Sequence, residues 1–226
     1  MRIAGGVFMN NLYGKIKSFF LFFIAFQFLL VNICYSETLF PNDLLVILND
    51  LKVAPDCRAP NYSRKNWQHW IDEDKDGQDT RQEVLISESL IAPTLRTDGK
   101  KVLAGRWNDP YTDNLFTKPS DLDIDHLVPL GEAHKSGGCH WSSTKKKNYA
   151  NDLVHEEELI AVSKKANRAK GQKDPAKWLP ENEKYQCEYV SNWILIKKRW
   201  GLWIDEKEKK AIETVINTKC VVDRDL

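Results

Sequence analysis

The stretch DLDIDHLVPL, residues 121–130, decides the fold of this chain. Apolar and acidic residues alternate from Leu122 to Leu130, which predicts a strand that ends near the proline in this stretch. A carboxylate beside an imidazole, here Asp125 beside His126, is typical of a metal site or of acid–base catalysis. A strand with a solvated acidic face is the alternative. In a regular strand these two side chains point to opposite faces, so a shared site requires the chain to twist between them.

The sequence that follows completes a strand–helix unit. Residues 158–162 (ELIAV) predict a second short strand, and Ser163 is placed to cap a helix through KKANRAKG, residues 164–171. The remaining predicted elements are helices at 41–52, 80–91, 182–199 and 205–219 and a strand at 101–107. Because helices outnumber strands and no linker interrupts them, the sequence predicts a single α+β domain over residues 37–226.

Residues 1–36 have the layout of a secretory signal peptide. Lys15 and Lys17 precede an apolar run at 19–31, and the small residues of the segment 34–36 (CYS) allow cleavage after its serine. A retained membrane anchor is the alternative, because the run is just long enough to span a bilayer. Either way the rest of the chain is expected to be secreted, extracellular or periplasmic. After cleavage no stable membrane association is expected.

Export changes how the cysteines are interpreted. Four cysteines follow residue 36, an even number for an oxidising compartment, and three pairings are possible. A zinc site is the rival interpretation, but no C-x-x-C pair occurs. Cys187 and Cys220 lie on two consecutive predicted helices and are expected to form a disulfide bond. That leaves Cys57 to pair with Cys139.

Composition and charge exclude several classes of protein. Of the 226 residues, 42% are hydrophobic and 29% are charged, which excludes a disordered chain and a polytopic membrane protein. The formal net charge is only +1, yet residues 134–173 hold nine basic and four acidic residues. This local excess predicts a surface that binds a polyanion. No helix-turn-helix or zinc finger is visible, so base-specific recognition is not expected.

Several motifs together resemble a known family. DIDHLVP at 123–129, NYANDL at 148–153, the apolar strand after it and N-R-x-K-G at 167–171 resemble the ββα-metal motif of HNH endonucleases. The surrounding sequence, over most of residues 64–220, is similar to secreted HNH nucleases related to the C-terminal domain of GmrSD restriction enzymes. The resemblance implies a ββα-metal core at about 121–175 that is surrounded by additional helices.

The resemblance also implies roles for individual residues. His126 would be the general base that takes a proton from the attacking water, and Asn151 would steady the loop and this histidine. Asp125 and Asn167 would hold one divalent cation, and an oxygen-only ligand set favours Mg²⁺, with Mn²⁺ as the alternative. The implied function is a secreted endonuclease that hydrolyses phosphodiester bonds, with DNA as the expected partner and little sequence specificity.

Basic residues near the motif are expected to contact substrate phosphates. Lys170 lies three residues after Asn167 and therefore on the same helical face. Ordinary solvated lysines are the alternative. The expected phosphate-binding residues are Lys145, Lys146, Lys147, Arg168 and Lys170.

An acidic loop at 72–83 is a second candidate metal site. It matches the D-x-D-x-D-G-x5-E calcium loop of EF-hands. The expected calcium ligands are Asp72, Asp74, Asp76, Gln78 and Glu83. The eighth position is Asp79 rather than a small apolar residue, so a solvated acidic turn is the alternative. An extracellular calcium-binding module on a decayed nuclease fold is accordingly the alternative function.

This loop also belongs to a longer pattern. Secreted HNH nucleases often carry a similar W-x-D-x-D-x-D-G-x-x-T-R stretch, which runs here from Trp70 to Arg81. The resemblance implies that Trp70, Thr80 and Arg81 form part of the scaffold of the fold.

Overall fold

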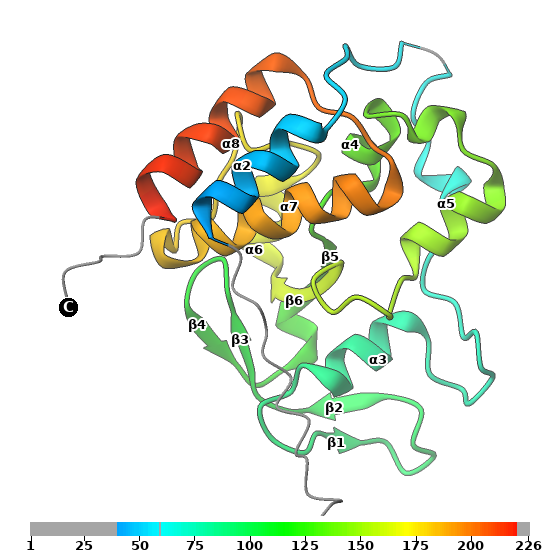
Figure 1. Ribbon diagram of the computed structural model, residues 1–226. Coiled ribbons are helices and arrows are strands. Elements are labelled where there is room, and N and C mark those ends of the chain that lie inside the picture. Colours follow the sequence, from blue (N-terminus) through cyan, green and yellow to red (C-terminus); the bar gives the residue numbers. More distant parts are fainter. Residues whose placement is uncertain (1–39, 59, 221–226) are drawn as a thin grey trace, which may run out of the picture. The chain divides into compact units, whose positions relative to one another are not determined.

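The computed structural model describes residues 40–58 and 60–220, and these residues form one compact unit (Figure 1). The predicted signal peptide lies outside the described residues. Within the described part of the chain, no helix is both long and apolar enough to cross a membrane. The fold class is α+β, as predicted: helices are combined with three two-stranded antiparallel sheets.

The predicted helices and strands are present within a few residues of their expected bounds. The α-helices are α2 (Pro41–Asp50), α3 (Thr80–Ser87), α4 (Leu130–Lys135), α5 (Ser143–Ala150), α6 (Lys164–Lys170), α7 (Gln186–Trp200) and α8 (Glu206–Lys219). The strands are β1 (Thr94–Leu95), β2 (Val102–Ala104), β3 (Trp107–Asp109), β4 (Asn114–Phe116), β5 (Leu122–His126) and β6 (Leu159–Ser163). Short 3₁₀ turns are η1 (Arg64–Asn66), η2 (Pro119–Asp121), η3 (Gly138–His140) and η4 (Glu183–Tyr185). Helices α4 and α5 and strands β1, β3 and β4 were not predicted.

Strands β5 and β6 and helix α6 form a ββα unit at the centre of the fold (Figure 1). The strands pair antiparallel, with Asp125 opposite Ile160 and His126 opposite Leu159. Helix α6 follows β6 directly because the Ser163 side chain accepts a hydrogen bond from the N–H of Ala166, a standard N-cap. This unit places the end of β5 against α6.

The predicted strand, from Leu122 to Pro129, is too long. Strand β5 ends at His126, and helix α4 begins at Leu130, with Pro129 as its N-cap residue. The alternation of apolar and acidic residues stops at His126, and every residue from Leu127 to Pro129 is buried. A proline before a helix is common because its missing N–H is not needed there, so the chain turns into α4 instead of continuing the strand.

Helices α2, α7 and α8 pack against one another on one side of the ββα unit (Figure 1). Their apolar faces supply much of the larger hydrophobic core, in which Leu48, Trp193 and Ile216 are completely buried. A second, smaller core lies between α3 and the β5–β6 pair and contains Trp107 and Leu122. The two cores cover the strands that carry the candidate site.

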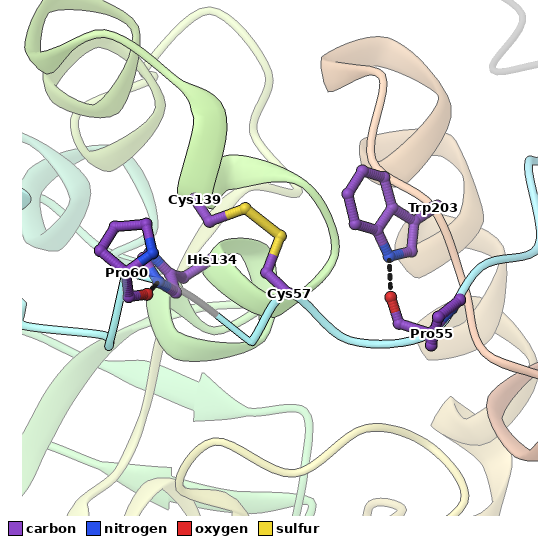
Figure 2. The surroundings of a disulfide bond; sticks show 6 residues. All are labelled: Pro55, Cys57, Pro60, His134, Cys139 and Trp203. Carbon is purple, nitrogen blue, oxygen red and sulfur yellow. Dashed lines mark hydrogen bonds between the residues drawn. A yellow bond between two sulfur atoms is a disulfide. The ribbon is translucent and has the colours of Figure 1, made fainter.

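Both disulfide bonds have the expected pairing. Cys187–Cys220 joins the beginning of α7 to the end of α8. Cys57–Cys139 ties the segment after α2 to η3, and Figure 2 shows this bond beside His134 and Trp203. Such long-range links restrict the unfolded chain, and each is expected to stabilise the fold by roughly 2–4 kcal/mol.

Candidate active site

A cavity of about 310 Å³ lies at the end of β5 and beside α6. Its lining includes Asp125 and His126 from β5 and Asn167 and Arg168 from α6. The ββα unit thus brings together four of the residues that the sequence singled out. Asp125 and His126 both line the cavity although they are neighbours in β5, whose pairing with β6 is regular through His126.

His126 is held in one orientation and one tautomer. The ring is only 5% exposed, and Nε2 lies 3.0 Å from the carbonyl oxygen of Ala150. Because a carbonyl only accepts, Nε2 carries the proton, and the lone pair is on Nδ1. Burial lowers the pKa of His126 to about 3, so the ring is neutral throughout the neutral pH range.

Two aromatic rings lie nearly parallel to the His126 ring. Tyr149 has its centroid 6.3 Å away and Trp70 has its centroid 5.7 Å away. Trp70 adopts a left-handed backbone conformation, with φ of +58°. Bulky residues rarely do so, and such strain is retained where surrounding contacts demand it. The stacking on His126 is one such contact.

Asp125 is a buried carboxylate with two partners on one oxygen. Its Oδ2 accepts hydrogen bonds from the Tyr111 hydroxyl at 2.7 Å and from the Lys170 ammonium at 2.6 Å. Burial raises the pKa of Asp125, and the positive charge of Lys170 opposes that rise. Oδ1 accepts no hydrogen bond from the described residues, so this oxygen is the one free to bind a ligand.

Asn167 offers the second oxygen. Its Nδ2 donates to Oδ2 of Asp123 at 3.3 Å, which leaves the amide oxygen of Asn167 for another partner. Asp123 thereby orients Asn167. Two unengaged oxygens on one cavity, from Asp125 and Asn167, fit a hard divalent cation such as Mg²⁺ that also keeps several waters or phosphate oxygens.

Asn151 joins three segments of the chain through its side-chain amide. Its Oδ1 accepts from the N–H of Ile71 at 3.2 Å and from the Thr80 hydroxyl at 2.9 Å. Its Nδ2 donates to the carbonyl oxygens of Gln68 and Lys147, each at 2.8 Å. The residue before it provides the carbonyl that orients His126, so these four bonds fix the position of that carbonyl.

The stretch from Trp70 to Arg81 contacts His126, Asn151 and the start of β5. Trp70 lies against His126, Thr80 bonds Asn151, and the Arg81 guanidinium donates to the carbonyls of Pro119 and Leu122 at the start of β5. None of the three residues lines the cavity, but Trp70 contacts His126, which does.

The prediction that Lys170 contacts a substrate phosphate is wrong. Its side chain is completely buried, and its ammonium group binds Asp125 and the carbonyl oxygen of His126. Helix α6 packs on β5, so the helical face shared with Asn167 points toward the strand instead of toward solvent. Lys170 is therefore the counter-charge of Asp125 and cannot reach a substrate phosphate in this conformation.

The lysine run at 145–147 is also placed differently from the prediction. Lys145 lies 4.5 Å from the Trp141 ring and donates to the Trp200 carbonyl, and Lys146 is buried. Lys147 pairs with Glu73 at 2.9 Å. Helix α5 packs among aromatic rings and an acidic loop, so these lysines do not line the cavity. Of the expected phosphate ligands, only Arg168 does.

Three residues of the site were missed by the sequence reasoning. Tyr111 binds Asp125, and Tyr62 and Arg64 line the cavity. Tyr111 lies in the turn sequence NDPYTDN, where an aromatic residue among turn formers was an available signal. Tyr62 and Arg64 lie about sixty residues before β5 in a segment without a regular pattern, and nothing in the sequence pointed to them.

The acidic loop gathers three of its expected calcium ligands. Carboxylate oxygens of Asp72, Asp74 and Asp76 lie within 4.8 Å of one another. Asp79, the eighth residue of the loop, instead caps α3 by accepting from the N–H of Gln82. Burial raises the pKa of Glu83, and the neighbouring acidic groups raise it further. The Gln78 side chain is turned away and donates to the carbonyl of Gly99.

These features define an α+β domain with a nuclease-like fold. The chain belongs to the family described as GmrSD restriction endonucleases, C-terminal domain, because the model of that family matches residues 77–215, more than half of the chain. The match includes the whole ββα unit and leaves Arg64 and the first five residues of the acidic loop, 72–76, outside.

A relative from Arthroderma benhamiae supports the cellular location. This protein, described as an uncharacterized secreted protein, is 36% identical over 173 residues, which cover 76% of this chain and 82% of the relative. Two disulfide bonds fit the same oxidising environment. The chain is therefore a secreted member of the family. No solved structure matches it.

Proposed function

We propose that the protein is a secreted HNH endonuclease that uses one divalent cation, Mg²⁺ or alternatively Mn²⁺, to hydrolyse phosphodiester bonds of DNA with little sequence specificity. One observation carries the proposal: His126, Asp125 and Asn167 line a single cavity on a ββα unit. Membership in a restriction endonuclease family supports a nucleic acid as the substrate.

The charges around the cavity favour an anionic substrate. Arg64 and Arg168 line it, and the charge of the single lining carboxylate, Asp125, is balanced by Lys170 behind it. The surplus positive charge attracts a phosphodiester backbone without reading its bases. This distribution explains how a protein with a small net charge can bind a polyanion.

His126 is the general base of this proposal. Its Nε2–H is committed to Ala150, so Nδ1 is the nitrogen that takes the proton from the attacking water. The pKa of about 3 keeps the ring unprotonated and ready before substrate binds. An incoming phosphate adds negative charge nearby, which favours the imidazolium and so raises the basicity of Nδ1 when it is needed.

The cation would be held by the free oxygens of Asp125 and Asn167. When bound, it supplies charge neutralisation for the phosphate and for the departing oxygen. Lys170 and Tyr111 fix the carboxylate of Asp125, and Asp123 fixes the amide of Asn167, so both ligands are oriented in advance.

The test is cleavage of supercoiled plasmid, linear DNA and RNA by the purified protein with Mg²⁺, with Mn²⁺ or with a chelator. We expect cleavage of DNA with either metal and none with the chelator. His126→Ala should lower the rate about 10²–10⁴-fold while substrate binding persists. His140→Ala is the matched control, because His140 is exposed and outside the cavity. Equal cleavage by the His126→Ala variant and the parent would refute the proposal.

Substitution of the metal ligands should reduce activity in a different way from substitution of the base. Asp125→Ala and Asn167→Ala remove oxygens and should weaken Mg²⁺ binding, so a higher metal concentration restores part of the rate. The same increase should not rescue His126→Ala. A titration of activity against metal concentration separates the two classes of variant.

A calcium-binding module on a decayed nuclease fold is the alternative function, and the clustered carboxylates of Asp72, Asp74 and Asp76 favour it. It predicts calcium binding without cleavage of any nucleic acid. The cleavage assay with its His126→Ala variant therefore decides between the two functions.

A further inference from the structure

A segment outside the family match reaches into the cavity. This segment, residues 57–58 and 60–70, precedes the matched region at 77–215, yet Tyr62 and Arg64 line the cavity together with His126. Arg64 is exposed and lies in the short turn η1. An exposed arginine side chain normally samples many conformations. It can contribute to binding at a site only if its backbone is held close to that site.

The beginning of this segment is fastened to α4 and η3. Cys57 forms the disulfide bond with Cys139, and its N–H donates to the carbonyl of Lys135 at 2.8 Å. The carbonyl of Pro60 then accepts from Nε2 of His134 at 2.7 Å, as Figure 2 shows. Because α4 begins at the cavity, these contacts hold the segment along its rim.

The end of the segment is fastened to the candidate base. Trp67 is buried against Tyr149, and its carbonyl accepts from Nδ1 of His69 at 2.7 Å. That bond leaves Nε2 of His69 as an acceptor, and Nη2 of Arg64 lies 3.3 Å from it. The ring of Trp70, next to His69, stacks on His126.

Arg64 thus lies between two anchored points, with its guanidinium oriented by His69. Arg64 and His126 line the same cavity, which puts the guanidinium and the candidate base at one site. A planar guanidinium that retains unpaired N–H donors is suited to a phosphate.

We propose that Arg64 binds a backbone phosphate of the substrate strand across the cavity from Arg168, and that the Cys57–Cys139 bond holds it there. The inference rests on the proposed function for the identity of the substrate. It assigns the recognised group as the phosphodiester anion, independent of base and sugar. It also gives this disulfide a role in substrate affinity in addition to stability.

The first test compares Arg64→Ala with Lys65→Ala. Lys65 is the next residue of the same turn, carries the same charge, is exposed and does not line the cavity. Binding of a fluorescent DNA duplex is measured in chelator, where no cleavage occurs. We expect Arg64→Ala to weaken binding about 10- to 100-fold, the value of a charged hydrogen-bonded contact, and Lys65→Ala to weaken it less than about threefold.

The salt dependence and the kinetics supply further readouts. Loss of one phosphate contact should reduce the slope of log affinity against log salt by about 0.9 for Arg64→Ala. With Mg²⁺, KM should rise while kcat stays within about threefold of the parent, and Arg64→Lys should recover part of the loss. Equal effects of Arg64→Ala and Lys65→Ala on affinity and slope would overturn the inference.

The second test addresses the disulfide. A Cys57→Ser/Cys139→Ser variant should weaken DNA binding, and adding Arg64→Ala to it should weaken binding little more, because both changes remove the same contact. Cys187→Ser/Cys220→Ser is the control that removes the other disulfide, and circular dichroism establishes that each variant is folded. Fully additive losses would overturn the role of the disulfide. If the variant does not fold, the same comparison is made on the parent and the Arg64→Ala protein after mild reduction.

These results separate the inference from the proposed function. If the parent binds DNA but never cleaves it, the endonuclease proposal fails, while the comparison of Arg64 with Lys65 still decides the phosphate contact. If the parent cleaves DNA and Arg64→Ala behaves as Lys65→Ala does, only the inference fails.

Discussion

The ammonium nitrogen of Lys170 lies 2.6 Å from Oδ2 of Asp125, and both side chains are almost completely buried. The same nitrogen donates to the carbonyl oxygen of His126 at 2.9 Å. Lys170 therefore contacts both of the residues at the end of β5 that the proposed chemistry requires. It balances the charge of Asp125 in the free protein, which permits a carboxylate to remain ionised in a buried site.

Removal of this lysine should destabilise the protein more than removal of a surface lysine. Lys170→Met leaves the Asp125 carboxylate buried without a counter-charge, and we expect the free energy of unfolding to fall by about 3–5 kcal/mol. Lys173→Met is the matched control, because Lys173 is exposed and follows the same helix. Its effect should stay within about 0.5 kcal/mol. Urea denaturation measures both, and similar values for the two variants would contradict the assignment.

Asn151 should act on activity through the carbonyl beside it. Asn151→Ala breaks four hydrogen bonds, of which three join the loop before β6 to Gln68, Ile71 and Thr80 and the fourth goes to the Lys147 carbonyl in α5. We expect a loss of about 2–4 kcal/mol in unfolding free energy, since buried partners are left unsatisfied. The same variant should have a lower kcat and an unchanged metal affinity, because His126 loses its fixed orientation. Asn148→Ala, on the exposed side of α5, should change neither quantity.

The depressed pKa of His126 predicts a pH dependence of stability. The pKa is about 3 in the folded protein and near 6.5 in an unfolded chain, so the unfolded state binds more protons between these values. The contribution of the neutral ring is complete above about pH 6.5 and is lost as the pH falls toward 3, with a slope of up to about 1.4 kcal/mol per pH unit. His126→Asn should remove that slope. Unfolding measured from pH 4 to 7 in both proteins provides the difference.

The low pKa of His126 also predicts how catalysis depends on pH. Because free enzyme needs the neutral ring, the acidic limb of kcat/KM should lie well below pH 6.5. A limb centred near 6.5 would show that His126 is solvated in the working enzyme, contrary to its burial.

The central ββα unit was predictable because its signals are local. Alternation specified β5, a continuous apolar run specified β6, and Ser163 specified the start of α6. Asp125, His126 and Asn167 lie within these elements, but it was the resemblance to the HNH motif, not the elements themselves, that implied a shared site for the three side chains. The predicted end of β5, at Pro129, is three residues too late, since the burial of Leu127 and Val128 depends on tertiary packing.

The partners of these residues were not predictable in the same way. Lys170 was assigned to solvent because its spacing from Asn167 defines a helical face, whereas the packing of α6 on β5 decides where that face points. Lys146 was likewise taken as exposed, although α5 buries it near Trp67. Arg64 lies in a segment whose ends contact residues far away in sequence, such as Cys139, His134 and Tyr149. Such contacts leave no periodic pattern.

The calcium prediction for residues 72–83 has its own test. Carboxylates of Asp72, Asp74 and Asp76 lie close together, and their mutual repulsion costs stability that a bound cation would relieve. With Ca²⁺ at about 100 times its dissociation constant, we expect a stabilisation of about 2.7 kcal/mol and a rise in melting temperature of roughly 5–10 °C. Chelation should reverse the rise.

A matched pair of variants separates coordination from a general effect of charge. Asp74→Asn removes an expected ligand and should abolish the calcium-dependent rise in melting temperature. Glu73→Gln removes the same charge from the second loop position, which is not a ligand in the EF-hand pattern, and should leave the rise intact. Cleavage by the parent should not depend on calcium when Mg²⁺ is present, because the two sites use different residues. If Asp74→Asn and the parent respond equally to calcium, or if calcium produces no rise, the loop is a polar turn that serves only to position Trp70 and Thr80.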